Sequence, residues 1–353
     1  EESSIDPRYT GDYISSDINI VEVDAAAEEN ELQSFFGRVN YSYDDRYLLT
    51  ATYRADGSSK FGGNNQYAYF PSIALGWTIS NEQFFSSSFI NNIKLRASWG
   101  ETGNQEIPSK ITQVSFEESR SDQNTYPLED DQLSIDDYPL GITFERLANP
   151  NLQWEVSRQT DIGLDFALFD QRLTGTIDYF LKVSDNILLE VTPPDPISPT
   201  PTFWTNIPDI EIRNQGLELS MAYSSKPGAA FSWTFGGNFS KINNEIINSP
   251  FRVLTTGSAQ GAGQTGATIN GYINGESVGS FYMLTFDGIG EDGLNQFVDL
   301  VPDGEQTDDD RSVVGSALPD VVYGFYANMG YKGFDLSVNF NGVAGNKIYN
   351  HNR

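Results

Sequence analysis

The chain has 353 residues and a formal net charge of -28, from 21 Lys plus Arg against 49 Asp plus Glu. An acidic surface repels phosphate backbones, which argues against nucleic acid as a partner. With no cysteine and one histidine, His351, the chain lacks the residues for disulfides, thiolate metal sites and histidine-based triads. Aromatic residues make up 13% of the chain, yet no apolar run reaches the roughly 18 residues of a membrane helix.

Alternation of apolar and polar residues is the main structural signal in the chain. Apolar or small residues occupy every second position in seven clear segments, in chain order 35–43, 49–55, 162–168, 173–181, 217–223, 231–239 and 334–340. A period of two predicts β-strands with one apolar and one polar face. Including less regular segments, we expect about ten or eleven strands and an all-β protein.

The connections between these segments differ sharply in length. The turns at 44–46, 170–171, 226–228 and 332–333 are tight, as in antiparallel hairpins. The stretches 103–152, 185–211 and 243–279 are long, polar and rich in Gly, Pro, Asn or Asp, and we expect loops there. This asymmetry predicts an antiparallel transmembrane β-barrel with short periplasmic turns and long extracellular loops.

The side chains on each face support the same interpretation. The polar face carries mainly Ser, Thr, Asn, Asp and Gly, which suit a wet lumen, and the apolar segments often end in Tyr or Trp. Tyr43, Trp77, Trp99 and Tyr331 are the candidates for aromatic girdles at the membrane interfaces. A soluble β-sandwich or β-helix also produces alternation and stays open as an alternative.

Seven short motifs, in a fixed order, resemble those of one protein family. They are Tyr53–Gly62 with R-A-D-G-S-S-K-F-G, Tyr69–Trp77 with F-P-S and G-W, Lys94–Asn104 with K-L-R-A-S-W-G and T-G-N, Asn149–Glu155 with N-P-N-L-Q-W-E, Asn214–Glu218 with N-Q-G-L-E, Gly315–Asp320, and Gly342–Ile348. Together they make the chain similar to SusC/RagA-type TonB-dependent outer-membrane transporters. From the residues alone, we attribute Gly57 and Gly103 to strand ends that need a positive φ.

The resemblance implies a piece of a 22-stranded barrel whose lumen holds a plug. It also implies a SusD/RagB-like surface lipoprotein as a lid, energy from the TonB complex, contact with outer-membrane lipids, and a place in a Gram-negative outer membrane. We expect residues 1–32 to be an extracellular loop segment and residues 33–353 to be part of the barrel domain. We expect the plug, the TonB box, the early strands and the last strands of the family to lie outside this sequence.

One acidic segment, residues 299–310, resembles an EF-hand or dockerin-type calcium loop. The candidate Ca²⁺ ligands are Asp299, Asp303, Glu305 through its carbonyl, Thr307 and Asp310, with Gly304 at the turn. Position 3 of such a loop is Val301, so one side-chain ligand is missing and any affinity would be weak. The alternative is a solvated acidic loop.

Aromatic residues in the predicted loops are candidates for substrate contact. They are Tyr126, Tyr138, Phe203, Trp204 and Tyr272. Such rings stack on sugars or hold peptide side chains, but they also pack within their own loops, and the second role is the more common one.

The resemblance favours active import of oligosaccharides or peptides across the outer membrane, and not an enzyme. Two alternatives remain from the sequence: a structural or adhesive outer-membrane barrel that binds surface polymers, and a soluble β-rich carbohydrate-binding protein. A plug and TonB box upstream would favour import.

Overall fold

The computed structural model describes residues 29–119, 141–191, 203–261 and 264–350. These residues form β-strands and two short 3₁₀ turns, η2 (Ile79–Asn81) and η4 (Asp308–Asp310). Among them no helix is long and apolar enough to cross a membrane. The all-β prediction is therefore confirmed.

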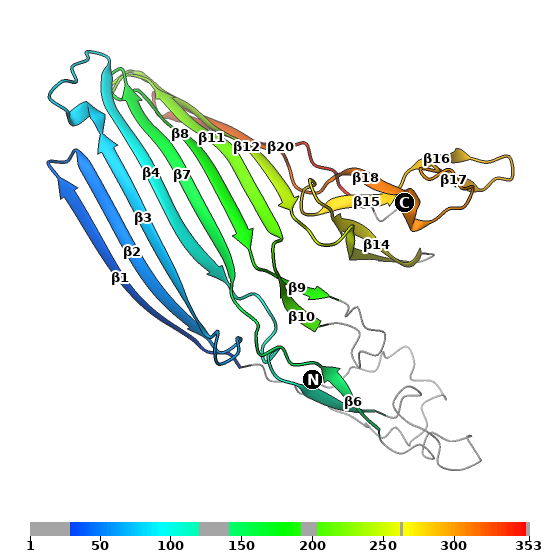
Figure 1. The fold of residues 1–353 in the computed structure, drawn as a ribbon. Coiled ribbons are helices and arrows are strands. Elements are labelled where there is room, and N and C mark those ends of the chain that lie inside the picture. The colour runs from blue at the N-terminus through cyan, green and yellow to red at the C-terminus, as the bar shows by residue number, and fades with distance from the viewer. Residues whose placement is uncertain (1–28, 120–140, 192–202, 262–263, 351–353) are drawn as a thin grey trace, which may run out of the picture.

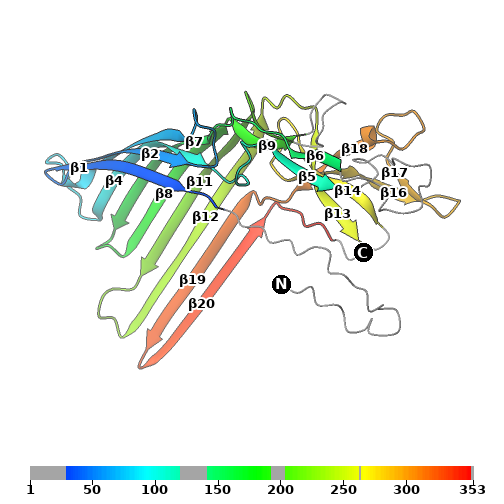
Figure 2. The same ribbon diagram turned by 90° about the horizontal axis from the view of Figure 1, so that it is seen from below.

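Ten long strands form one antiparallel sheet, in the order β1-β2-β3-β4-β7-β8-β11-β12-β19-β20 (Figure 1). Their bounds are β1 (Leu32–Tyr43), β2 (Tyr47–Ser58), β3 (Tyr67–Thr78), β4 (Ile90–Asn104), β7 (Glu155–Leu168), β8 (Leu173–Asp185), β11 (Glu211–Ser224), β12 (Phe231–Ile247), β19 (Val321–Tyr331) and β20 (Phe334–Ala344). β1 and β20 are its two edges, so the sheet is an open wall in one layer, as expected for part of a barrel (Figure 2).

The pairing register explains why alternation specifies this sheet. Leu49 lies opposite Leu75, Ile162 opposite Tyr179, and Phe325 opposite Phe340, so apolar residues share one face along every strand. We call this the apolar face and the other the polar face. The side chains of the apolar face are solvent-exposed in the isolated chain; Leu75 and Ile162 are each 53% exposed. A soluble sheet would bury them, whereas a membrane covers them with lipid.

The short connections are hairpins at one end of the sheet. Asp44 and Asp45 have φ of 53° and 50°, and Lys332 and Gly333 have φ of 48° and 85°. Two successive positive φ angles give the turn whose twist matches antiparallel strands, which Asp and Gly tolerate best. All the long connections leave the opposite end, which we call the long-loop end (Figure 1).

The long connections contain more structure than the sequence predicted. Small antiparallel sheets form from β5 (Ser115–Ser119) and β6 (Gly141–Arg146), β9 (Ile187–Val191) and β10 (Phe203–Ile207), β13 (Leu254–Gly261), β14 (Gln264–Tyr272), β15 (Ser280–Leu284) and β18 (Arg311–Ser316), and β16 (Phe286–Ile289) and β17 (Asn295–Phe297). The long connections expected at 103–152, 185–211 and 243–279 are present, and short strands that the sequence did not indicate occur within and beyond them. Short strands with irregular patterns leave too weak a period to detect.

Candidate functional site

The motif residues of the first half of the chain meet in one buried cluster at the long-loop end. Phe61, Phe70, Leu152 and Trp154 are each at most 6% exposed and pack with Ile107, Ile111 and Leu188. The Trp154 ring lies 4.9 Å from that of Phe61 and 5.7 Å from that of Phe70, the latter edge-on. We call this cluster the aromatic core. Three motifs that are far apart in sequence thus build one rigid platform.

Hydrogen bonds and close backbone contacts lock this platform. The Trp154 indole donates to the Gln66 carbonyl at 3.1 Å. A Cβ on Gly103 would lie 2.2 Å from the Phe70 ring, and one on Gly57 would lie 2.7 Å from the Tyr67 ring. Neither glycine has a positive φ. The attribution of these two glycines to left-handed backbone was therefore wrong: each makes room for an aromatic ring.

The described aromatic candidates for substrate contact are packed against apolar clusters. Trp204 packs against the aromatic core, and its carbonyl accepts a 2.9 Å hydrogen bond from Asn149. Phe203 and Tyr272 pack against a second buried cluster, which consists of Ile187, Val191, Ile207, Ile210 and Ile246. Burial raises the pKa of the Tyr272 phenol. Tyr126 and Tyr138 lie outside the described residues. A substrate role for all five stays a prediction.

A polar cavity of about 510 Å³ lies at the long-loop end of β11 and β12, where two parts of the connection between β12 and β19 meet. We call it the polar pocket. Its polar lining includes Asn214, Asn243, Asn244, Glu276, Ser277, Ser280, Ser316 and Asp320, and its apolar lining Ile242, Val313, Leu318 and Pro319. Three of the sequence motifs supply residues to it, at Asn214, at 315–320 and at Gly345. The motifs did not indicate that these residues form one pocket, because its walls include segments more than 100 residues apart.

A chain of side-chain hydrogen bonds fixes the wall of the polar pocket. The Asn244 amide donates to Asn214 at 2.6 Å, and its oxygen accepts from the Ser277 hydroxyl at 3.0 Å and from the Val278 backbone at 2.7 Å. Ser316 donates to the Ser277 hydroxyl at 3.2 Å. The pocket is thus held in shape by its own residues.

The predicted calcium loop is closed by one of its own carboxylates. Asp310 is 1% exposed and accepts backbone hydrogen bonds from Leu300 at 2.9 Å, Val301 at 3.1 Å and Thr307 at 2.9 Å. These bonds hold the pKa of Asp310 below its usual value, the bond from Thr307 first. Both oxygens of Asp310 are therefore occupied by backbone amides.

The other predicted calcium ligands also take part in the turns of this loop. Asp299 accepts from the Gly304 backbone at 3.3 Å, and Asp303 from that of Glu305 at 2.8 Å. The Thr307 hydroxyl caps η4 by accepting from Asp309 at 3.3 Å. In the described part of the chain, no three acidic or histidine side chains gather closely enough to hold a metal ion. The calcium site stays a prediction.

Charged residues on the polar face form a network that the sequence did not reveal. Arg96 of β4 donates to Asp165 of β7 at 2.8 Å and to Asp178 of β8 at 2.9 Å. It reaches β8 only because Gly163 stands between them: a Cβ there would lie 2.1 Å from an Asp178 oxygen. On the other face, nearer the long-loop end, Arg158 pairs with Glu101 and Asp185. Three strands are thus tied by side chains on the polar face.

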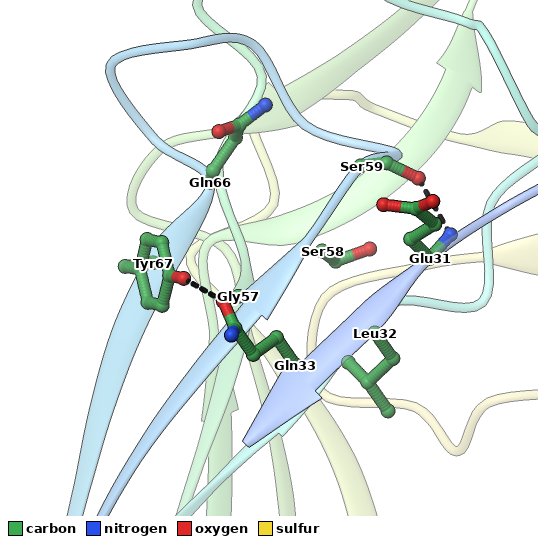
Figure 3. Close-up of a pocket in the computed structure, with 8 residues that line it drawn as sticks. All are labelled: Glu31, Leu32, Gln33, Gly57, Ser58, Ser59, Gln66 and Tyr67. Atoms are coloured by element: carbon green, nitrogen blue, oxygen red, sulfur yellow. Dashed lines mark hydrogen bonds between the residues drawn. The ribbon is translucent and has the colours of Figure 1, made fainter. Parts of the chain in front are cut away.

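A second cavity, of about 520 Å³, lies beside edge strand β1 (Figure 3). Tyr67 donates its hydroxyl to Gln33, and the Glu31 backbone donates to Ser59 at 2.8 Å (Figure 3). Its lining comes from β1, β2 and β3 and from the residues next to them, so it lies over the long-loop ends of the first three strands.

The comparisons with known proteins agree with this architecture. Residues 3–347 match the family described as "TonB dependent receptor-like, beta-barrel". The chain belongs to this family. Like other barrels of the family, it is part of an outer-membrane β-barrel of a Gram-negative bacterium. The long-loop end is accordingly the extracellular end, and the apolar face is the lipid-facing one.

Two curated relatives and one solved structure show the level of similarity. The chain is 34% identical to TonB-dependent receptor P3 of Formosa agariphila, over 92% of this chain and 33% of that protein. It is 31% identical to TonB-dependent receptor SusC of Bacteroides thetaiotaomicron, over 94% of this chain and 33% of that protein. It superposes on the RagAB peptide transporter with a TM-score of 0.71 and 25% identity, over 90% of this chain and 33% of that one. The chain thus spans about a third of the length of these proteins.

Proposed function

We propose that the protein imports oligosaccharides or peptides across the outer membrane by a TonB-dependent mechanism. The observation that carries this proposal is the two-sided wall. One sheet has an apolar face for lipid, a charged and polar face for a wet lumen, and all its long connections at one end. Family membership supports TonB as the energy source for import, because the similar proteins are named TonB-dependent receptors.

A surface lipoprotein lid of the SusD/RagB type and the TonB complex are the proposed partners. The structural similarity to RagAB, named a peptide transporter, supports the import of a ligand larger than a porin admits. In this mechanism the extracellular end holds the ligand, the lid closes over it, and TonB displaces the plug. The proposal includes no enzymatic step, and the similar proteins are receptors and transporters.

Uptake by living cells tests the proposal. A strain lacking the whole gene, and the same strain carrying it, are given fluorescent oligosaccharides and peptides, with and without a protonophore that removes the energy for TonB. We expect accumulation only in energised cells that carry the gene. Equal surface binding with and without the protonophore, and no accumulation inside, would support the adhesive barrel instead.

A further inference from the structure

The size and position of the polar pocket suit the binding of one building block of a larger transported ligand. Its volume of about 510 Å³ falls within the range of roughly 300–1,000 Å³ that small-molecule sites occupy. It lies at the extracellular ends of β11 and β12, where an incoming ligand would first meet the barrel wall.

The pocket is formed before any ligand enters. Backbone hydrogen bonds join its segments: Ile242 donates to the Asp320 carbonyl at 2.8 Å, Ile246 to that of Glu276 at 2.9 Å, and Ala317 to that of Gly279 at 3.2 Å. Ser280, 1% exposed, donates its hydroxyl to the Ser277 carbonyl at 2.7 Å. A wall fixed in this way loses little entropy when it binds.

Two carboxylates in the lining remain available to a ligand. Glu276 and Asp320 are the only charged residues among the lining residues, and their side chains make no hydrogen bond or ion pair with other described residues. Gly345, with φ of 91°, gives the Asp320 carboxylate its space: a Cβ there would lie 2.4 Å from it. A negative pocket disfavours sulfate, phosphate and uronate groups, because like charges repel.

The mixed lining distinguishes between the remaining ligand classes. Asparagine amides offer both donors and acceptors, and carboxylates accept from neighbouring hydroxyls. Val313, Leu318 and Pro319 add apolar side chains to the lining. Hydroxyls around a ring with an apolar C–H face complement this combination, whereas an amine would use the acceptors alone.

We propose that the polar pocket is a binding subsite for a neutral sugar unit of the transported ligand. The proposal rests on the import function proposed above. It assigns Glu276 and Asp320 to the sugar hydroxyls and the apolar lining residues Val313, Leu318 and Pro319 to the ring face. Asn214, Asn244 and Ser277 hold the wall in place.

Binding to the complete receptor, purified in detergent with its lid, tests this subsite. The probes are maltohexaose, laminarihexaose and xylohexaose as neutral sugars, trigalacturonate as an anion and trilysine as a cation, measured by calorimetry. The variant Glu276→Gln with Asp320→Asn removes both charges, and Leu318→Trp fills the pocket. Asp287→Asn with Glu291→Gln, on the exposed β16–β17 hairpin, is the control with the same change in net charge.

We expect at least one neutral hexasaccharide to bind more tightly than either charged probe. Each pocket variant should weaken the binding of that hexasaccharide about tenfold, and the control variant should leave it unchanged. The double variant loses charge-assisted hydrogen bonds, and Leu318→Trp loses space in the pocket. The proposal would be overturned if trigalacturonate or trilysine bound more tightly than the neutral sugars, or if no neutral sugar bound. It would also be overturned if the pocket variants bound the neutral sugar as tightly as the wild type. Because binding is measured without uptake, energised uptake that the pocket variants leave unchanged would sink the subsite and leave the import function standing.

Discussion

The ten-stranded sheet and the small clusters at its extracellular end place their apolar residues in opposite ways. The sheet exposes them, with Leu75 and Ile162 each 53% exposed, whereas the aromatic core hides Phe61 at 1% and Leu152 at 0%. Lipid replaces the protein interior for the first, and the second follows the rules of a water-soluble protein. One chain thus folds in two solvents, and a substitution should act differently in each.

The largest expected effect is on the aromatic core. Trp154→Ala removes a buried ring in contact with Phe61 and Phe70 and should destabilise the extracellular end by about 3–5 kcal/mol. Trp99→Ala, on the apolar face at 38% exposure, is the control and should cost less. Urea unfolding of the complete receptor in lipid vesicles, followed by circular dichroism, measures both; an equal loss would contradict the difference between the regions.

A charge on the lipid side should come next. Ile73→Lys places an ammonium on the apolar face, midway between Tyr69 and Trp77 of β3, and should cost about 2–4 kcal/mol near the middle of the bilayer. The adjacent Ala74→Lys points to the polar face, where the cost should stay under about 1 kcal/mol. The fraction of receptor that folds into vesicles over a urea series compares them. Equal costs would mean that the two faces are not in different solvents.

A smaller effect is expected within the charged network of the polar face. Gly163→Ala would push its methyl group into Asp178 and Arg96 and should cost about 1–3 kcal/mol through overpacking and displacement. Gly37→Ala is the matched control, since a Cβ on Gly37 meets nothing within 4 Å. Denaturation midpoints of the two variants give the comparison, and a smaller loss for Gly163→Ala than for Gly37→Ala would contradict the contact.

The smallest effect concerns pH at the short-turn end. Tyr47 donates to Glu82 at 2.6 Å, Trp77 at 2.9 Å and Arg46 at 3.1 Å. These bonds, that of Tyr47 first, hold the pKa of Glu82 below its usual value. Glu82 therefore stabilises the fold above its unfolded pKa, and this contribution is lost as the pH falls through its folded pKa. Melting temperatures from pH 7 to about pH 3 should fall further in the wild type than in Glu82→Gln; parallel curves would exclude the effect.

The sheet could be predicted from sequence because each of its rules is local. Alternation sets the face, and tight turns such as Asp44–Asp45 set the register, so Tyr43 and Tyr47 pair as expected. The girdle candidates Tyr43 and Tyr331 lie on the apolar face, 54% and 47% exposed. The division into residues 1–32 and 33–353 stays a prediction, since β1 begins at Leu32 and residues 1–28 lie outside the described residues.

The extracellular end could not be predicted because its contacts are distant in sequence. Phe61 and Trp154 are 93 positions apart, and only folding brings their rings to 4.9 Å. Asp310 resembled a metal ligand by spacing, but three backbone amides reach its carboxylate. The polar pocket likewise depends on Asn214 and Ser316 meeting through Asn244 and Ser277. None of these pairings has a local signature.

The two-sided wall is tested most directly by single cysteines along β12, since the chain contains none of its own. Cysteines replace Phe235, Gly237 and Phe239 on the apolar face, and Thr234, Asn238 and Ser240 on the polar face. In intact outer membranes, a charged, water-soluble maleimide should label only the polar-face positions, and an apolar maleimide dissolved in lipid should label the others. Equal labelling of both sets by the charged reagent would contradict the barrel wall.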